Sequence, residues 1–218
     1  MRGIVFSGGE GPSPERCREL LAEARREASP VLIAAADSGL EAAEAAGIRP
    51  GWILGDMDSL DDPARLAVYP AERVLRFPRA KDDTDTELAL RLLRDQGCDE
   101  LWIAGGGGGR TDHLLALRAL FEQESPPRRW LTAREDIRLL DAEAGAGELS
   151  LACRRGTPVS VFPLGQGPWK AGSEGLRWPL EPVAWERGRF SLSNETDAGS
   201  FCIRALAGRF LALVLQRA

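Results

Sequence analysis

The chain has 218 residues, enough for one large or two small domains with buried cores. Its 28 lysines and arginines against 33 aspartates and glutamates give a formal net charge of -5, so a broad basic surface for nucleic acid is not expected. No stretch approaches the ~20 apolar residues of a membrane span and no signal peptide is evident, so we expect a cytoplasmic protein without a membrane partner. The four cysteines are widely spaced, which argues against a zinc site or a disulfide framework.

The first half of the chain alternates short apolar runs with helical patterns. Strands are predicted at residues 3–9, 31–37, 51–56, 73–78 and 100–105, and helices at residues 14–28, 38–47, 85–97 and 112–124. Ser13 and Pro14 fit an N-cap and a first helical position, and Gly47 and Gly97 fit helix ends. Strands that alternate with helices predict an α/β domain with a mainly parallel, doubly wound sheet.

The period changes after Pro126 and Pro127, which we take as the domain boundary. Seven short, partly alternating segments follow, separated by glycine, proline or asparagine, at residues 128–133, 136–142, 147–154, 158–165, 188–194, 200–206 and 209–216. This pattern predicts an all-β second domain, a sandwich or a jelly roll. The predicted domains are residues 1–125 and 128–218.

Acidic residues stand where the predicted strands of the first domain end. Asp37 ends one strand, and Asp56 and Asp58 end another in the stretch GWILGDMDSL. Because a strand repeats every two residues, Asp56 and Asp58 are expected on one face, roughly 7 Å apart. Paired carboxylates of this kind suit Mg²⁺, which accepts one or two protein carboxylates together with waters and phosphates. The alternative is a turn with a helix cap.

The stretch KDDTDTE adds three acids, Asp82, Asp83 and Asp85, just before a predicted helix. Thr84 and Glu87 fit the capping box T-x-x-E, which explains the threonine but not the gathering of acids from separate strand ends. In an open parallel sheet the carboxyl ends of the strands line one crevice. The acids are therefore expected to meet at one edge.

A glycine run, residues 105–109, leads from a predicted strand through Arg110 into a helix. Backbone N–H groups and a helix N-terminus would then face an anion, and the guanidinium would suit phosphate oxygens. The alternative is a flexible turn with a solvated arginine. His113 is the single histidine, and without a G-x-S-x-G motif it is expected to be structural rather than a catalytic base. Carboxylates, metal and arginine are the groups used in phosphoryl transfer.

The motifs AADSGL, GWILGDMDSL, KDDTDTELAL, GGGGGRTDH and SLSNE resemble, in order and spacing, those of the thiamine pyrophosphokinase family. The resemblance implies an α/β catalytic domain that binds nucleotide and metal, a β-sandwich domain that binds thiamine, and a homodimer. It also implies an enzyme, thiamine diphosphokinase, that uses Mg²⁺ to transfer a pyrophosphoryl group from ATP to the hydroxyethyl oxygen of thiamine. The products would be thiamine diphosphate and AMP.

The resemblance assigns expected roles by matching position. The acids that would hold Mg²⁺ or orient the hydroxyl are Asp37, Asp56, Asp58 and Asp85, with Asp56, Asp58 and Asp85 as metal ligands. The expected ATP-binding residues are Asp82, Thr84, Gly107, Gly108, Gly109, Arg110 and Asp112, and Arg110 is also expected in catalysis. Trp178, Ser193 and Asn194 are expected to hold thiamine, the alternatives being a core tryptophan and a turn.

Two points leave the acceptor open. Ser38 stands where the family often has glycine, which could alter a turn that needs positive φ. The second domain matches only in short motifs. The alternatives are a pyrophosphokinase for another heterocyclic alcohol such as a hydroxymethylpterin, a non-catalytic nucleotide or thiamine binding module, and a metal-dependent phosphohydrolase. A non-catalytic module has little use for four carboxylates that repel one another.

Overall fold

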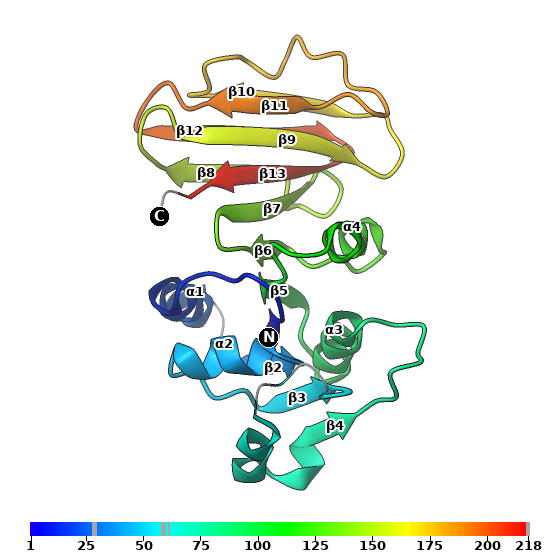
Figure 1. Cartoon of the computed structure of the whole chain (residues 1–218). Helices are drawn as coiled ribbons and strands as arrows, with labels where there is room; N and C mark the ends of the chain where they lie inside the picture. The colour runs from blue at the N-terminus through cyan, green and yellow to red at the C-terminus, as the bar shows by residue number, and fades with distance from the viewer. Residues whose placement is uncertain (28–29, 58–59, 61, 217–218) are drawn as a thin grey trace. The chain divides into compact units, whose positions relative to one another are not determined.

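The computed structural model describes residues 1–27, 30–57, 60 and 62–216 (Figure 1). The chain divides into two compact units. The first comprises Met1–Leu120 and Trp130–Ala133, and the second comprises Phe121–Arg129 and Arg134–Ala218.

The first unit alternates strands and helices as predicted. Its regular elements are β1 (Arg2–Ser7), α1 (Pro14–Glu27), β2 (Val31–Ala36), α2 (Gly39–Ala45), β3 (Trp52–Gly55), β4 (Val74–Arg76), α3 (Asp85–Asp95), β5 (Glu100–Gly105) and α4 (Thr111–Ala119). Short 3₁₀ helices occur at Pro63–Val68 and Ala71–Arg73. The division between the units falls inside a third 3₁₀ helix, Leu120–Glu122, and inside a short strand, β6 (Arg129–Leu131).

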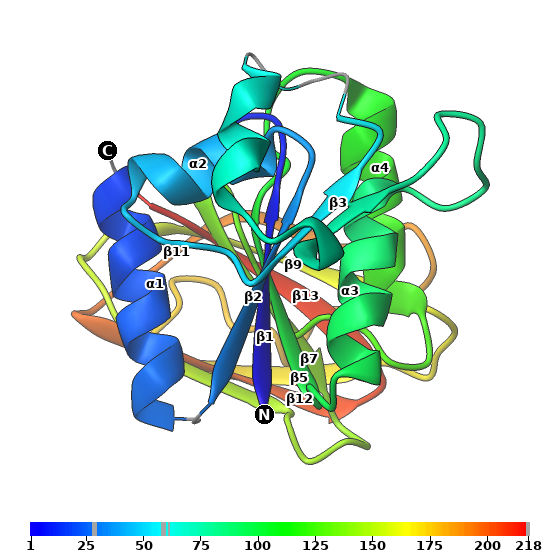
Figure 2. The same cartoon turned by 90° about the horizontal axis from the view of Figure 1, so that it is seen from below.

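Strands β1 to β5 of this unit form a parallel sheet covered on both faces. The order is β6-β5-β1-β2-β3-β4. The pairs β5–β1, β1–β2, β2–β3 and β3–β4 are all parallel. Helices α1 and α2 lie on one face, and α3 and α4 lie on the other (Figure 2). This is the predicted doubly wound arrangement.

The core of the α/β unit explains its strand sequences. All six residues of β1 are buried, as expected for a central strand of a sheet covered on both faces. Phe6, Leu40 and Trp102 are among its largest side chains and are at most 2 % exposed. Burial of each such side chain contributes roughly 1.5–3 kcal/mol before entropy costs. The sheet is therefore a rigid support for the loops that leave its carboxyl edge.

The second unit is built from antiparallel strands. They are β7 (Glu135–Asp141), β8 (Glu148–Ala152), β9 (Pro158–Leu164), β10 (Lys170–Glu174), β11 (Ser191–Glu195), β12 (Ser200–Ala207) and β13 (Arg209–Leu215). Four of them run in the order β11-β9-β13-β7, and three form a separate sheet, β10-β12-β8. The all-β prediction is confirmed, whereas β10 was not predicted because KAGSE has only one apolar side chain, that of Ala171.

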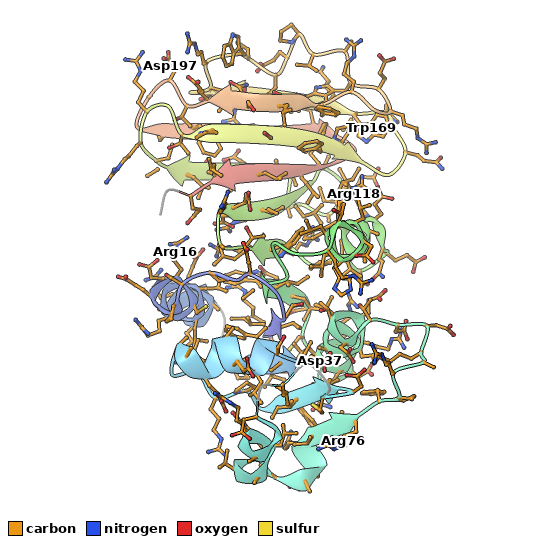
Figure 3. All side chains as sticks on the ribbon, in the orientation of Figure 1. Arg16, Asp37, Arg76, Arg118, Trp169 and Asp197 are labelled. Atoms are coloured by element: carbon orange, nitrogen blue, oxygen red, sulfur yellow. The ribbon has the colours of Figure 1, made fainter. Side chains whose placement is uncertain are left out.

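The two sheets of the second unit share one apolar core, as in a β-sandwich. Leu140 and Phe210 come from the four-stranded set, and Phe201 and Ile203 from the three-stranded sheet. Trp169, labelled in Figure 3, packs against this core and donates a hydrogen bond from Nε1 to the Leu164 carbonyl at 2.8 Å. The alternating strand pattern therefore places one side of each sheet inside.

Two sequence expectations concern the whole chain. Within the described part of the chain, no helix is long and apolar enough to cross a membrane. All four cysteines, Cys17, Cys98, Cys153 and Cys202, are free thiols. The absence of a disulfide framework in the described structure agrees with the cysteine spacing.

Candidate functional site

The α/β unit contains a cavity of about 510 Å³ at the carboxyl edge of its sheet. Several strand ends contribute to it: Ser7 ends β1, Asp37 follows β2, Asp56 follows β3, and the glycines at 106–109 follow β5. The first turns of α3 and α4 also line it. This is the edge at which open parallel sheets bind their ligands.

Three predicted acids, Asp37, Asp56 and Asp85, meet in this cavity. Burial raises the pKa of Asp37 to about 7, and the hydrogen bond and negative charge of Asp85 add to this effect. The charge of Asp56 acts in the same direction, whereas a hydrogen bond from the Met57 amide to Asp37 Oδ1, at 3.2 Å, opposes it. Figure 3 labels Asp37, in the loop after β2. The site therefore holds a carboxyl group that can exchange a proton near neutral pH.

The backbone around β3 differs from the predicted spacing. Strand β3 ends at Gly55, and Met57 has a positive φ of 64°. The predicted strand therefore ends one residue early, before Asp56, and the expected spacing of Asp56 and Asp58 no longer follows from strand alternation. Asp58 itself lies outside the described residues. The chain turns at Asp56 because Gly55, with φ of 146°, lets the backbone pass close to Asp37.

Gly55 is required by this close approach. A Cβ atom at Gly55 would lie 1.9 Å from Asp37 Oδ1, closer than any van der Waals contact allows. Ser38, in contrast, has an ordinary right-handed φ of -61°, and the positive φ of 47° falls on Asp37. The serine therefore fits its turn without backbone strain, and the concern raised by its sequence is resolved.

The N-terminus of α3 carries the predicted capping box. The Glu87 amide donates to Thr84 Oγ1 at 3.2 Å, and the Thr84 amide donates to Glu87 Oε2 at 2.9 Å. Thr84 also lines the cavity, together with Asp83. Asp82 is exposed and does not line it. The cap fixes the first turn of α3 and so fixes Asp85 against Asp37.

Two cations beside these acids were not predicted. Arg79 and Lys81 both line the cavity. Lys81 Nζ lies 3.1 Å from Asp85 Oδ1 in an ion pair whose side chains are 15 % and 18 % exposed. The sequence feature that could have indicated them is the pair of basic residues immediately before the acidic run in FPRAKDDTD. A loop that carries both charges suits an anionic ligand with a bound cation.

The glycine turn after β5 is built by its backbone conformation. Gly106, Gly108 and Gly109 have positive φ. The Gly107 amide donates to the Glu10 carbonyl at 2.8 Å, so it serves the turn rather than an anion. A Cβ at Gly108 would lie 2.4 Å from Glu10 Cδ. This turn needs glycine for conformation and for space.

Arg110 is exposed and holds Asp112 at the start of α4. Its Nε donates to Asp112 Oδ1 at 3.1 Å, and its Nη2 also bonds Oδ2. Arg110 keeps the pKa of Asp112 below its usual range. Asp112 Oδ1 also accepts from the His113 amide at 3.0 Å. Arg110 and His113 line the cavity, whereas Asp112 does not.

The predicted residues of the second unit form a separate group. Trp178 is 52 % exposed, so it is not a core residue. Asn194 is only 2 % exposed, and its side chain donates to the Trp178 carbonyl at 2.6 Å and accepts from the Trp178 amide at 3.2 Å. Ser193 has a positive φ of 55°, and its amide donates to Ser160 Oγ at 3.0 Å. Asn194 thus fixes the backbone that presents Trp178.

The acids fit a hard divalent cation in their chemistry. Asp85 Oδ1 is buried and has no hydrogen-bond partner, although Lys81 pairs with it electrostatically. Carboxylate oxygens are the ligands that Mg²⁺ prefers. Over residues 1–27, 30–57, 60 and 62–216, no three acidic, histidine or cysteine side chains stand close enough together to form a metal site. One or two carboxylates suffice for Mg²⁺ when waters and substrate phosphates complete its coordination.

Fold and cavity together define the class: an α/β unit with an acidic, glycine-lined ligand site, joined to an antiparallel β unit. Residues 25–126 match the family model described as "Thiamin pyrophosphokinase, catalytic domain". A thiamine pyrophosphokinase of Bacillus subtilis (strain 168) is 39% identical over 71 residues, which are 32% of this chain and 33% of that protein. Residues 25–126 of this chain are therefore similar to the catalytic domain of thiamin pyrophosphokinases.

Solved structures agree with the fold. The crystal structure of a thiamine pyrophosphokinase from Bacillus subtilis has a TM-score of 0.77 and 21% identity, covering 100% of both chains. A thiamin pyrophosphokinase from Candida albicans has a TM-score of 0.71 and 14% identity, covering 99% of this chain and 90% of that one. At these identities the likeness establishes the fold alone. The matched segment spans only about a third of the Bacillus subtilis sequence relative.

Proposed function

We propose that this protein catalyses the Mg²⁺-dependent transfer of a pyrophosphoryl group from ATP to the hydroxyethyl oxygen of thiamine, giving thiamine diphosphate and AMP. One observation carries the proposal: Asp37 after β2, Asp56 after β3 and Asp85 at the start of α3 share a cavity with a glycine turn inside the segment that matches the catalytic-domain family. Acids beside a phosphate-type turn suit positioning and charge neutralisation, which dominate phosphoryl transfer.

In this proposal Asp37 is the group that accepts the hydroxyl proton of thiamine. Its pKa of about 7 lies near the working pH, where a general base is most effective. The hydroxyl oxygen would attack the β-phosphorus, and the bond from that phosphorus to the α–β bridging oxygen would break. The bridging oxygen would leave with AMP.

Asp56, Asp58 and Asp85 are the proposed ligands of Mg²⁺. When bound, the ion would neutralise charge on the transferred group. Arg79, Thr84, Gly108, Gly109 and Arg110 line the cavity and are proposed to contact the nucleotide. Three other residues would act indirectly. Asp82 would act through the loop before α3, Gly107 through the glycine turn, and Asp112 by orienting Arg110.

The acceptor is proposed to contact the second unit. The exposed face of Trp178 suits the cationic thiazolium or the flat pyrimidine of thiamine, and Ser193 lies on the neighbouring strand β11. Asn194 would hold Trp178 in place. We retain residues 1–125 as the catalytic domain and 128–218 as the thiamine-binding and dimerisation domain. A homodimer is proposed, and sedimentation as a monomer at micromolar concentration would count against a shared site.

The direct test is incubation of the purified protein with ATP, Mg²⁺ and thiamine. The expected products are AMP and thiamine diphosphate in equal amounts. Parallel reactions replace thiamine with a hydroxymethylpterin or omit the acceptor. AMP formed only with the pterin would overturn the proposed acceptor, phosphate released without any acceptor would indicate a hydrolase, and no reaction with bound nucleotide would indicate a binding module.

A further inference from the structure

Lys81 is held between the acid cluster and its own loop. Its Nζ lies 3.1 Å from Asp85 Oδ1 and donates a hydrogen bond to the Pro78 carbonyl at 3.3 Å. The side chain lines the cavity and is 15 % exposed. An ammonium group therefore stands beside the buried carboxylate oxygen that has no hydrogen-bond partner.

This ion pair differs from the other pairs near the cavity. Arg91 and Asp83, also beside α3, are 58 % and 36 % exposed, and Arg110 and Asp112 are 73 % and 60 % exposed. Water and salt screen such exposed charges strongly. The charge of Lys81 is screened least, so it acts most strongly on any ion that approaches Asp85.

We propose that Lys81 is an internal counter-ion that occupies Asp85 in the nucleotide-free protein and must be displaced before a divalent cation can bind there. The inference rests on the proposed function, in which Asp85 is a metal ligand. Lys81 neutralises one of three neighbouring carboxylates and repels a second cation. A divalent cation alone therefore binds weakly, and it enters together with the nucleotide, whose phosphates offer negative charge to the displaced ammonium.

Lys81 is thus a positioning residue that sets the order in which metal and nucleotide enter. It holds Asp85 in place before the reaction. A merely structural lysine would behave differently, because its removal would weaken metal binding or leave it unchanged. The sign of the change in metal affinity therefore separates the two roles.

The test measures Mn²⁺ binding to the nucleotide-free protein by electron paramagnetic resonance. Lys81→Met keeps the apolar stem and removes the charge, so Mn²⁺ affinity should rise on the order of tenfold. Lys81→Arg keeps the charge and should retain the weak wild-type affinity. Arg91→Met, the matched control on α3, should change affinity by less than about twofold because its pair is exposed. Unchanged or weaker binding in Lys81→Met overturns the proposal.

Stability supplies a second measurement. Without metal, Lys81→Met and Lys81→Gln should melt lower than wild type, because Asp85 loses its counter-ion. Saturating Mn²⁺ should restore more of the melting temperature in these variants than in wild type. Variants that stay unfolded even with saturating Mn²⁺ contradict the proposal. If the metal ion takes the place of the Lys81 ammonium beside Asp85, the protein should fold without that ammonium once the metal is bound.

Failure of this inference is distinguishable from failure of the proposed function. Neither measurement uses thiamine or ATP. If the wild type forms no thiamine diphosphate while Lys81→Met binds Mn²⁺ more tightly, only the proposed reaction fails. If the wild type forms thiamine diphosphate while Lys81→Met binds Mn²⁺ no more tightly, only the role of Lys81 fails.

Discussion

Replacing Asp37 by asparagine should make the metal-free protein more stable at alkaline pH while it removes activity. The raised pKa of Asp37, about 7 against an ordinary value of 3.8, means that the folded protein holds a proton that the unfolded chain has released. The stabilising contribution of this group is complete below about pH 3.8 and is lost as the pH rises through about 7. An asparagine has no such dependence.

The magnitude follows from the pKa difference. A shift from 3.8 to about 7 corresponds to at most ~4 kcal/mol across the whole range. Asp37 is only partly buried, so solvent screening reduces the expected effect to ~2 kcal/mol. The asparagine oxygen can still accept from the Met57 amide, which holds Asp37 Oδ1 at 3.2 Å in the wild type. The loop conformation should therefore survive.

The assay is urea unfolding of both proteins at about pH 5, 6, 7 and 8, with a chelator to remove metal. The free energy of unfolding of the wild type, relative to Asp37→Asn, should fall by ~2 kcal/mol over this range. Turnover of Asp37→Asn should drop by orders of magnitude at every pH. A stability difference that does not change with pH would refute the argument that burial and Asp85 raise this pKa.

Three further predictions concern Gly55, the pair Asp56 and Asp58, and Trp178. Gly55→Ala should lower stability by roughly 1–3 kcal/mol and remove most activity, because its Cβ would displace Asp37; a urea midpoint and an AMP assay close to wild type would contradict this. Asp56→Asn and Asp58→Asn should each keep the fold but lose turnover by orders of magnitude, as measured by melting temperature and AMP release. A variant that melts at a lower temperature yet turns over normally would indicate that the replaced aspartate is a helix cap instead. Trp178→Ala should raise the KM for thiamine far more than the KM for ATP, with a stability change within about 0.5 kcal/mol because Trp178 is half exposed; equal loss for both substrates would exclude an acceptor role.

Features that depend on residues close together in the sequence, or on the general geometry of parallel sheets, could be predicted from the sequence. The capping box of Thr84 and Glu87 was predictable because both partners lie within one helical turn. The meeting of Asp37 with Asp85 was predictable in outline, because parallel strands bring their carboxyl ends to one edge. The end of β3 at Gly55 was not, because it depends on the distance between two loops.

Residue order alone was enough to predict the alternation of strands and helices, the change to β structure after Pro127, and the acids at the strand ends. These features depend on residue periodicity and on contacts within a few residues. Two contacts become visible only in the folded chain: Lys81 pairs with Asp85 inside the cavity, and Asn194 bonds the backbone of Trp178. Such contacts depend on how separate loops pack in space, where burial and neighbouring charge, rather than residue type, set what each side chain does.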